Sequence, residues 1–165
     1  MKYDQSYKYP AKLSNKDLQS IILFYLLECP VEGKSQRGKT FKEYGYIGSP
    51  SFSRLKKRLF SSATLSLRKN YYPCTKEELN NCLKKCEGIN YPEEYCCFLK
   101  SYENSVIRSM FSAIRNALAH GSFNVRSYKG KRIYFFSNYK EYEKARIVLY
   151  EATLLSWIKI IKNEE

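Results

Sequence analysis

The order of apolar and polar positions predicts a chain made mostly of helices. Residues 15–29, "NKDLQSIILFYLLEC", carry a nearly continuous apolar run, so we expect a helix near the centre of the fold. Ser14, with Asp17 three residues later, can cap the start of this helix, and Pro30 helps to end it. A second helix is expected in residues 51–69, with the "RLKKR" cations facing outward. Its predicted inward-facing residues are Phe52, Leu55, Leu59 and Phe60.

The middle of the chain predicts two further helices. Thr75 and Glu78 have the spacing of a capping box at the start of "KEELNNCLKKC", and Gly88 is placed to end that helix. The longest periodic segment lies within residues 91–120, where apolar residues form one stripe at helical spacing, and Gly121 is placed to end it. The stripe consists of Val106, Ile107, Met110, Phe111, Ile114, Ala117 and Leu118.

The C-terminal part predicts a hairpin and a last helix. Residues 122–138 contain two β-prone runs that turn near Lys129 and Gly130. A helix is expected in residues 144–162, which are rich in Ile and Leu on more than one side. No repeat, low-complexity tract or linker divides the sequence, so we expect one domain over residues 1–165. The predicted fold class is all-α, a bundle of about five helices with a short β-hairpin before the C-terminal helix.

The composition argues against a disordered chain and against a membrane-spanning one. A hydrophobic fraction of 44% and an aromatic fraction of 16% exclude a disordered chain. No apolar run reaches the length of a membrane span, and the N-terminus lacks the apolar centre of a signal peptide, so we expect a cytoplasmic protein. The 6 cysteines include no Cys-x-x-Cys pair. We therefore expect reduced thiols, no metal site and no cofactor.

The charge points to a polyanionic partner. Lys and Arg number 29 against 16 Asp and Glu, which gives a net charge of +13. Such an excess favours nucleic acid or an anionic membrane surface, although no single helix pairs a broad lysine face with an aromatic edge. A basic protein whose lysines lie on solvated faces has the same charge. In "SFSRLKKRLF" cations and aromatic residues alternate, as in an RNA-binding track, but an amphipathic helix with a solvated basic face gives the same pattern. The candidate RNA-binding residues are Arg54, Lys57, Arg58 and Arg108.

One short motif suggests a nucleotide triphosphatase. Residues 33–40, "GKSQRGKT", match the phosphate-loop pattern G-x-x-x-x-G-K-[ST]. A working phosphate loop follows a buried strand, opens a helix and needs a later acidic residue for magnesium. Here the preceding run is helical, the following "FKEYGYIGSP" does not fit a helix, and Asp4 and Asp17 both precede the loop. We interpret the match as coincidental, although Lys34, Arg37 and Lys39 can still contact phosphates.

The stretch "RNALAH" carries the candidate chemistry. His120 is the only histidine, and histidine is the side chain that ordinarily titrates near neutral pH. Arg115 lies five residues earlier, which on an unbroken helix is about 140° around the axis and about 7.5 Å along it. The two share a site only if the helix frays or ends there, and Gly121 offers such an end. Alternatively, His120 is a simple helix cap and Arg115 a solvated residue.

An arginine and a histidine in one cleft suit the cleavage of RNA. Imidazole can take the proton of a ribose 2′-hydroxyl or give one to the leaving 5′-oxygen. The guanidinium of Arg115 can hold the phosphate and offset the charge that gathers on its oxygens. The amide of Asn116 can orient either partner. RNA supplies its own nucleophile, so no metal-bound water is required.

At these residues the chain resembles the HEPN superfamily (higher eukaryote and prokaryote nucleotide-binding domains). That family is a helical bundle marked by Arg, four to six residues and His, often with a polar residue after Arg; Arg115, Asn116 and His120 match, and the resemblance covers residues 91–161. It implies a metal-independent endoribonuclease of a toxin–antitoxin, abortive-infection or other bacterial defence system. It also implies a homodimer whose two Arg–His sets face one cleft, with Arg115 and His120 catalytic and Asn116 supporting.

The resemblance leaves regulation and activity open. One branch of the family carries a tyrosine two positions after the histidine, which a partner nucleotidyltransferase modifies. This chain has Ser122 there, so that route is not expected, although an antitoxin or another regulatory partner is possible. Some members of the family only bind RNA. We therefore keep two hypotheses, an RNA endonuclease and a non-catalytic RNA-binding or scaffold module.

Overall fold

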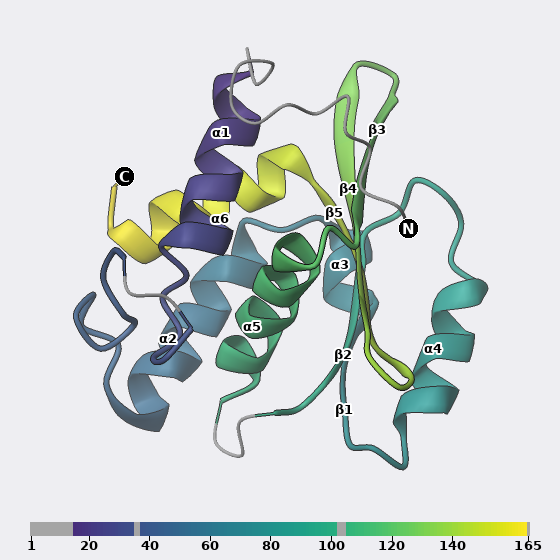
Figure 1. Ribbon diagram of the computed structural model, residues 1–165, viewed down its shortest axis with the longest axis horizontal. Helices are drawn as coiled ribbons and strands as arrows, with labels where there is room; N and C mark the ends of the chain where they lie inside the picture. Colours follow the sequence, from purple (N-terminus) through teal and green to yellow (C-terminus); the bar gives the residue numbers. More distant parts are fainter. Residues whose placement is uncertain (1–14, 35–36, 102–104, 165) are drawn as a thin grey trace.

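The computed structural model describes residues 15–34, 37–101 and 105–164. Among these residues four helices precede the first strand, and three strands follow one another before the last helix; the sheet stands between a group of helices and the single helix α4 (Figure 1). In chain order the elements are α1 (Lys16–Ile22), the π-helix η1 (Leu23–Leu27), α2 (Gly48–Ser61), α3 (Leu65–Lys69), β1 (Tyr71–Cys74), α4 (Leu79–Glu87), β2 (Tyr95–Leu99), α5 (Val106–Ala119), β3 (Phe123–Tyr128), β4 (Lys131–Tyr139), β5 (Glu143–Tyr150) and α6 (Glu151–Lys162).

The fold class predicted from the sequence is wrong. The described residues form a 5-stranded sheet in the order β1-β2-β5-β4-β3, so the protein is a mixed α/β protein and not an all-α bundle. The strands β1 and β2 are parallel and are joined through α4, whereas the other neighbouring strands are antiparallel. Only the β3–β4 hairpin, which turns at Lys129 and Gly130, was expected.

The strand β5 was mistaken for the start of the last helix. It lies at the centre of the sheet, between β2 and β4, and Ile147, Val148 and Leu149 are consecutive buried residues. A strand that is buried on both faces shows no alternation of apolar and polar residues, so its pattern is the same as that of a buried helix. The helix predicted over 144–162 therefore exists only from Glu151 onward.

The chain changes from strand to helix at Glu151. Its buried carboxylate accepts hydrogen bonds from Arg132 Nε at 2.9 and 2.8 Å and from Tyr134 Oη at 2.7 Å. The Nη2 atom of Arg132 completes the ion pair at 2.7 Å from Glu151 Oε1. These contacts attach the first turn of α6 to β4, and they also place a negative charge at the positive end of the helix.

The strands β1 and β2 were not expected because both are short. The β1 strand holds only 4 residues, including Pro73, and it forms the edge of the sheet, where proline is tolerated. Between the two strands the predicted capping box is confirmed, since Thr75 N–H donates to Glu78 Oε2 at 2.9 Å and Glu78 N–H donates to Thr75 Oγ1 at 3.4 Å. Gly88 ends α4 as predicted.

Most predicted helices are confirmed, with corrected ends. Ser14 lies outside the described residues, and the first helix is capped by Asn15, which accepts hydrogen bonds from the Asp17 and Leu18 amides. The helix expected over 51–69 is divided into α2 and α3, with Thr64 capping α3. Its predicted inward residues Phe52, Leu55 and Leu59 are buried, and Phe60 is half-buried; on α5 every residue of the predicted stripe except the half-buried Val106 is buried.

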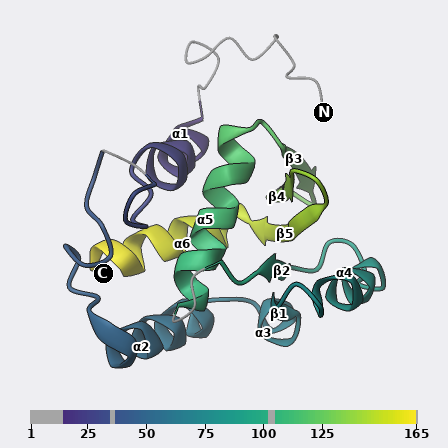
Figure 2. The ribbon, with the colours of Figure 1, turned by 60° about the horizontal axis from the view of Figure 1, so that its bottom comes forward.

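The main core lies between the sheet and the helical layer of α1, η1, α2, α5 and α6 (Figure 2). At its centre Phe111 of α5 stacks on Tyr25 at 5.5 Å and meets the ring of Phe41 edge-on at 5.5 Å. The rings of Phe24 and Trp157 lie 6.5 and 6.1 Å from Phe111. A smaller core, made of Cys74, Leu79, Leu83, Cys86 and Cys97, lies between α4 and the other face of the sheet.

The stretch that matches the phosphate loop is a structural turn between η1 and α2. Thr40 does not open a helix; its N–H and hydroxyl donate to Glu43 Oε2 at 2.8 and 3.0 Å. Gly33 and Gly38 both have φ of +75°. A Cβ on Gly38 would lie 2.6 Å from Glu28 Cβ, whereas no described atom lies within 4 Å of a Cβ on Gly33. Packing against Glu28 therefore requires glycine at position 38.

The two glycines make a matched pair of tests. Gly33→Ala should cost about 1 kcal/mol of unfolding free energy, since only the left-handed backbone is strained. Gly38→Ala adds the clash with Glu28 and should cost about 2–4 kcal/mol. Urea unfolding followed by circular dichroism measures both values. Equal costs for the two variants would contradict the close packing of Gly38.

Candidate active site at the end of helix α5

The helix α5 holds all three residues of the "RNALAH" motif and has a fixed end. At its start Ser105 accepts a hydrogen bond from the Arg108 amide. At its end Gly121 N–H donates to the Leu118 carbonyl at 3.2 Å, and Ser122 N–H donates to the Ala117 carbonyl at 2.8 Å. This paired arrangement, with Gly121 at φ +65°, is a Schellman motif. The helix therefore does not fray at the motif.

The intact helix separates Arg115 from His120. The His120 amide still donates to the Asn116 carbonyl at 3.0 Å, so the helical path continues to His120. Five helical residues turn the chain by about 140°, and no hydrogen bond joins the two side chains in the described part of the chain. Asn116 and His120, four residues apart, lie on the same side of α5. Asn116 and His120 thus start from one side of α5, whereas the Arg115 side chain starts from another.

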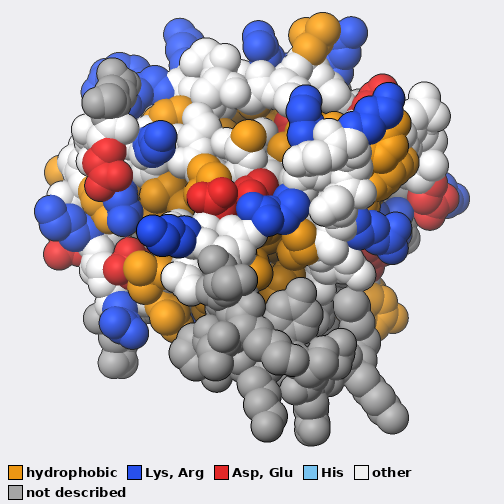
Figure 3. Space-filling view, turned by 90° about the horizontal axis from the view of Figure 1, so that it is seen from above, with side chains coloured by type: hydrophobic (Ala, Val, Ile, Leu, Met, Phe, Trp, Pro, Cys, Tyr) orange, Lys and Arg blue, Asp and Glu red, His pale blue; other side chains and the backbone are white. Residues whose placement is uncertain are grey.

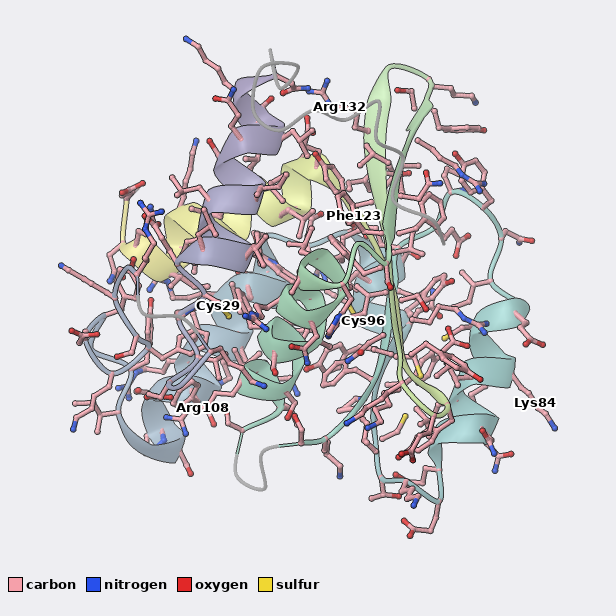
Figure 4. The ribbon with its side chains drawn as sticks, in the orientation of Figure 1. Cys29, Lys84, Cys96, Arg108, Phe123 and Arg132 are labelled. Atoms are coloured by element: carbon pink, nitrogen blue, oxygen red, sulfur yellow. The ribbon has the colours of Figure 1, made fainter. Side chains whose placement is uncertain are left out.

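Arg115 lies half-buried beside the end of η1. Its Nη1 donates to Asn116 Oδ1 at 3.4 Å, and its buried Nε has no hydrogen-bond partner among the described residues. Burial raises the pKa of the Cys29 thiol, and the nearby charges of Arg115 and Lys34 partly oppose this shift. Arg115 and Lys34 therefore place two positive charges near Cys29. In the view of Figure 4, Cys29 and Arg108 lie on one side of α5, and Phe123 and Cys96 lie on the other.

A hollow of about 380 Å³ adjoins Asn116, and we call it the α5 hollow. Ser109, Ser112, Ala113 and Asn116 line it from one face of α5, at spacings of three and four residues. The remaining lining residues are Lys34, Leu99, Ser101, Asn138 and Lys144. None of these lining residues is acidic, and they present two ammonium groups, hydroxyls and amides. This combination suits the binding of a phosphate group.

The predicted RNA-binding residues fall into two groups. Arg54 and Lys57 are exposed on α2 and face solvent. Arg58 donates to Asn163 Oδ1 at 3.0 Å, which ties α2 to the end of α6. Arg108 pairs with Glu32 at 3.4 Å and lies 4.6 Å from the ring centre of Phe52. Arg58 and Arg108 therefore hold the fold together, while Arg54 and Lys57 are available to a partner.

Several residues of the α5 hollow were missed in the sequence. Ser109 and Ser112 recur at helical spacing with the predicted Asn116 within an otherwise apolar helix, and this polar stripe was a usable signal. Lys144 gave no signal, because it was placed inside the last helix instead of at the start of β5. Lys34 was noted only as part of a basic loop, and the fold brings it to α5.

The cysteines form no site that we can assign. All 6 are free thiols, and Cys74 Sγ lies 4.0 Å from Cys97 Sγ between β1 and β2. Burial is the main cause that raises the pKa of the Cys74 thiol to about 12. In the described ranges no group of three or more His, Cys, Asp or Glu residues has the arrangement of a metal site. None of the described helices is long and apolar enough to span a membrane.

Comparison with known proteins identifies no similar protein. No family model matches the chain, and neither the curated proteins nor the solved structures contain a significant match. We therefore infer the function from the residues themselves, from their positions in the fold and from the motif in α5.

The exposure of His120 gives a direct chemical test. Because its ring lies at the surface at the end of α5, diethyl pyrocarbonate should modify it in the folded protein. The chain has 1 histidine, so the rise in absorbance should correspond to one imidazole and should be reversed by hydroxylamine. His120→Ala is the control and should show no such signal. Modification only after unfolding would contradict the placement.

Proposed function

We propose that this protein is a metal-independent endoribonuclease of the HEPN type. The observation that supports this most is the exposure of its only imidazole, His120, at the end of the α5 face that carries Asn116. The same face continues toward the start of the helix through Ser112 and Ser109, into the α5 hollow with its two lysines. An RNA backbone with one phosphate in the hollow would bring a neighbouring phosphate toward His120.

The reaction that we propose needs only the RNA and the side chains of His120 and Asn116 to move protons and orient the phosphate. A nitrogen of His120 accepts the proton of a ribose 2′-hydroxyl, whose oxygen then attacks the adjacent phosphorus. The bond to the 5′-oxygen breaks, and this oxygen takes up a proton from imidazolium. The products are a 2′,3′-cyclic phosphate and a free 5′-hydroxyl. Asn116 would orient the phosphate through its amide.

The position of Arg115 favours a dimeric site. Within one chain Arg115 leaves α5 about 140° around the axis from His120, and its guanidinium contacts Asn116 and lies near Cys29. In our proposal two copies meet around the C-terminal end of α5. Arg115 of one copy then stabilises charge on the phosphate that the 2′-oxygen attacks, while His120 of the other copy moves the protons. The guanidinium of the half-buried Arg115 would supply the donors for a phosphate oxygen.

The biological setting is proposed from the motif alone. Endoribonucleases with this motif belong to bacterial toxin–antitoxin and abortive-infection systems, and we propose a cytoplasmic role of that kind. An antitoxin or another regulatory partner would then restrain the activity. The charge of +13 is consistent with RNA as the substrate.

The first test is an RNA cleavage assay in the presence of EDTA. His120→Ala should lower the cleavage rate by about 10²–10⁴-fold, the range expected when a general acid–base group is removed. Arg115→Ala should lower it by a similar order, because transition-state charge is left uncompensated. Lys84→Ala is the control, since Lys84 points away from the molecule on α4 (Figure 4) and should not matter. An inert wild type, or equal cleavage by all variants, would refute the proposal.

A second candidate function is RNA binding without cleavage. The absence of carboxylates from the residues that line the α5 hollow, together with Lys34 and Lys144, favours it independently of His120. Lys and Arg side chains are also spread over the face seen in Figure 3, with hydrophobic side chains and fewer Asp and Glu side chains between them. This surface suits phosphate contacts that carry no base sequence information.

The two lysines of the hollow can be tested by the salt dependence of binding. The double variant Lys34→Ala/Lys144→Ala should bind single-stranded RNA about tenfold more weakly and should reduce the slope of log K against log salt by about 1.4. Lys84→Ala is the control, because it removes one exposed lysine on α4. Both values should change only by the small amount that the loss of one positive charge causes anywhere on the protein. An unchanged slope in the double variant would show that the hollow does not hold phosphate.

A further inference from the structure

The sheet has one face that helices cover only in part. The strands β1 and β2 carry α4 on this face, with Cys97 in the smaller core (Figure 2). Val148 of β5 pairs with Tyr95 on one side and with Phe135 of β4 on the other, so Phe135 belongs to the same face. Phe135 in turn pairs with Asn124 of β3. At β3 and β4 the face therefore extends beyond α4.

Aromatic rings gather on this uncovered part. Tyr91, from the loop before β2, lies parallel to Phe135, with ring centres 6.1 Å apart and planes at 11°. The ring of Tyr128 meets Tyr91 edge-on at 5.3 Å. Tyr91 is 49% exposed, although a ring of this size gains free energy by burial. An exposed ring that is held in place by two neighbours offers a preformed surface for stacking.

Cations lie directly over the same rings. The guanidinium carbon of Arg126 is 5.0 Å from the ring centre of Phe135, and Lys129 Nζ is 5.3 Å from that of Tyr128. Lys131 Nζ lies 5.7 Å from the ring centre of Tyr150 at the edge of the group. All three cations are exposed. The face thus combines stacking rings with positive charge.

Two carboxylates lie near these rings, and only one faces solvent. Glu94 is fully buried; it accepts hydrogen bonds from Thr64 Oγ1 and, at 2.7 Å, from the Tyr150 amide. Glu93 is exposed, and it is one of the charges that help to raise the pKa of Tyr150, after burial, the main cause. Three exposed cations against one exposed acid leave the face positive, so it is complementary to phosphate.

We propose that this hairpin face, formed by Tyr91, Tyr128, Phe135, Arg126, Lys129 and Lys131, binds unpaired bases of single-stranded RNA. A base stacks on the exposed ring of Tyr91, which the half-buried rings of Tyr128 and Phe135 hold in place, and the cations contact the flanking phosphates. This inference rests on RNA as the partner of the proposed function but not on cleavage. The face is separate from the α5 hollow, because Phe135 and Asn138 lie on opposite faces of β4. RNA could therefore be held at one site while it is cut at the other.

The test compares a normal oligonucleotide with one that lacks bases. Both probes are about twelve nucleotides long, within the usual size of such sites, and one is oligouridylate while the other is an abasic ribose-phosphate strand. Fluorescence anisotropy is measured in the His120→Ala background, so that the probe is not cut. Tyr91→Ala/Tyr128→Ala should weaken oligouridylate binding about tenfold or more, the effect of losing base stacking, and should leave abasic binding unchanged.

Two matched variants complete the experiment. Tyr91→Phe/Tyr128→Phe keeps the rings and should bind oligouridylate like the parent. Tyr139→Ala removes an equally bulky ring, 67% exposed, from the other end of β4 and should have no effect. The inference is overturned if the alanine pair binds oligouridylate normally, if it loses both probes equally, or if the phenylalanine pair fails like the alanine pair. Thermal unfolding of each variant shows that folding is unchanged. A protein that binds RNA here but never cleaves it would refute only the endonuclease.

Discussion

The arrangement depends on the packing of Phe111 at the centre of α5. Its ring contacts rings from η1, the loop before α2 and α6, so one side chain joins segments that are far apart in the sequence. Each such aromatic pair adds about 0.5–1.5 kcal/mol beyond area burial, and the rings restrict how α5 can rotate. Because Phe111 faces the core, Asn116 and the serines of the same helix face the α5 hollow. Rotation of α5 would remove the hollow and redirect His120 together.

The second constraint is the incomplete cover of the sheet. One face carries the helical layer and the main core, whereas the other carries only α4 over β1 and β2. Large aromatic residues on the uncovered part would favour association with other copies if they lacked charge. Arg126 and Lys129 lie over these rings and keep them accessible to a charged partner. The two faces of the sheet therefore serve different roles in our proposals, one phosphate-binding and one base-binding.

Comparison of particular elements shows which parts of the sequence pattern were informative. The helix α5 was correctly placed because one face is buried and one is polar, so its period is visible. The hairpin was placed because Lys129 and Gly130 mark its turn. In contrast, β5 is central and buried on both sides, and β1 and β2 are short strands that exist only by pairing. None of these three strands shows the alternation of apolar and polar residues that identifies a strand in a sequence. For this reason the sequence predicted an all-α protein.

Some features of the candidate site are visible in the sequence, and others exist only because of the fold. The sequence by itself determined the "RNALAH" motif, the capping signals around it, the single histidine and the charge of +13, because these are local or additive properties. The tertiary structure decided that Lys34 and Lys144 meet on the α5 face and that Tyr91 reaches Phe135. These contacts join residues far apart in the chain. Only the pairing of the strands and the packing of α5 fix such distances, and neither leaves a local signal in the sequence.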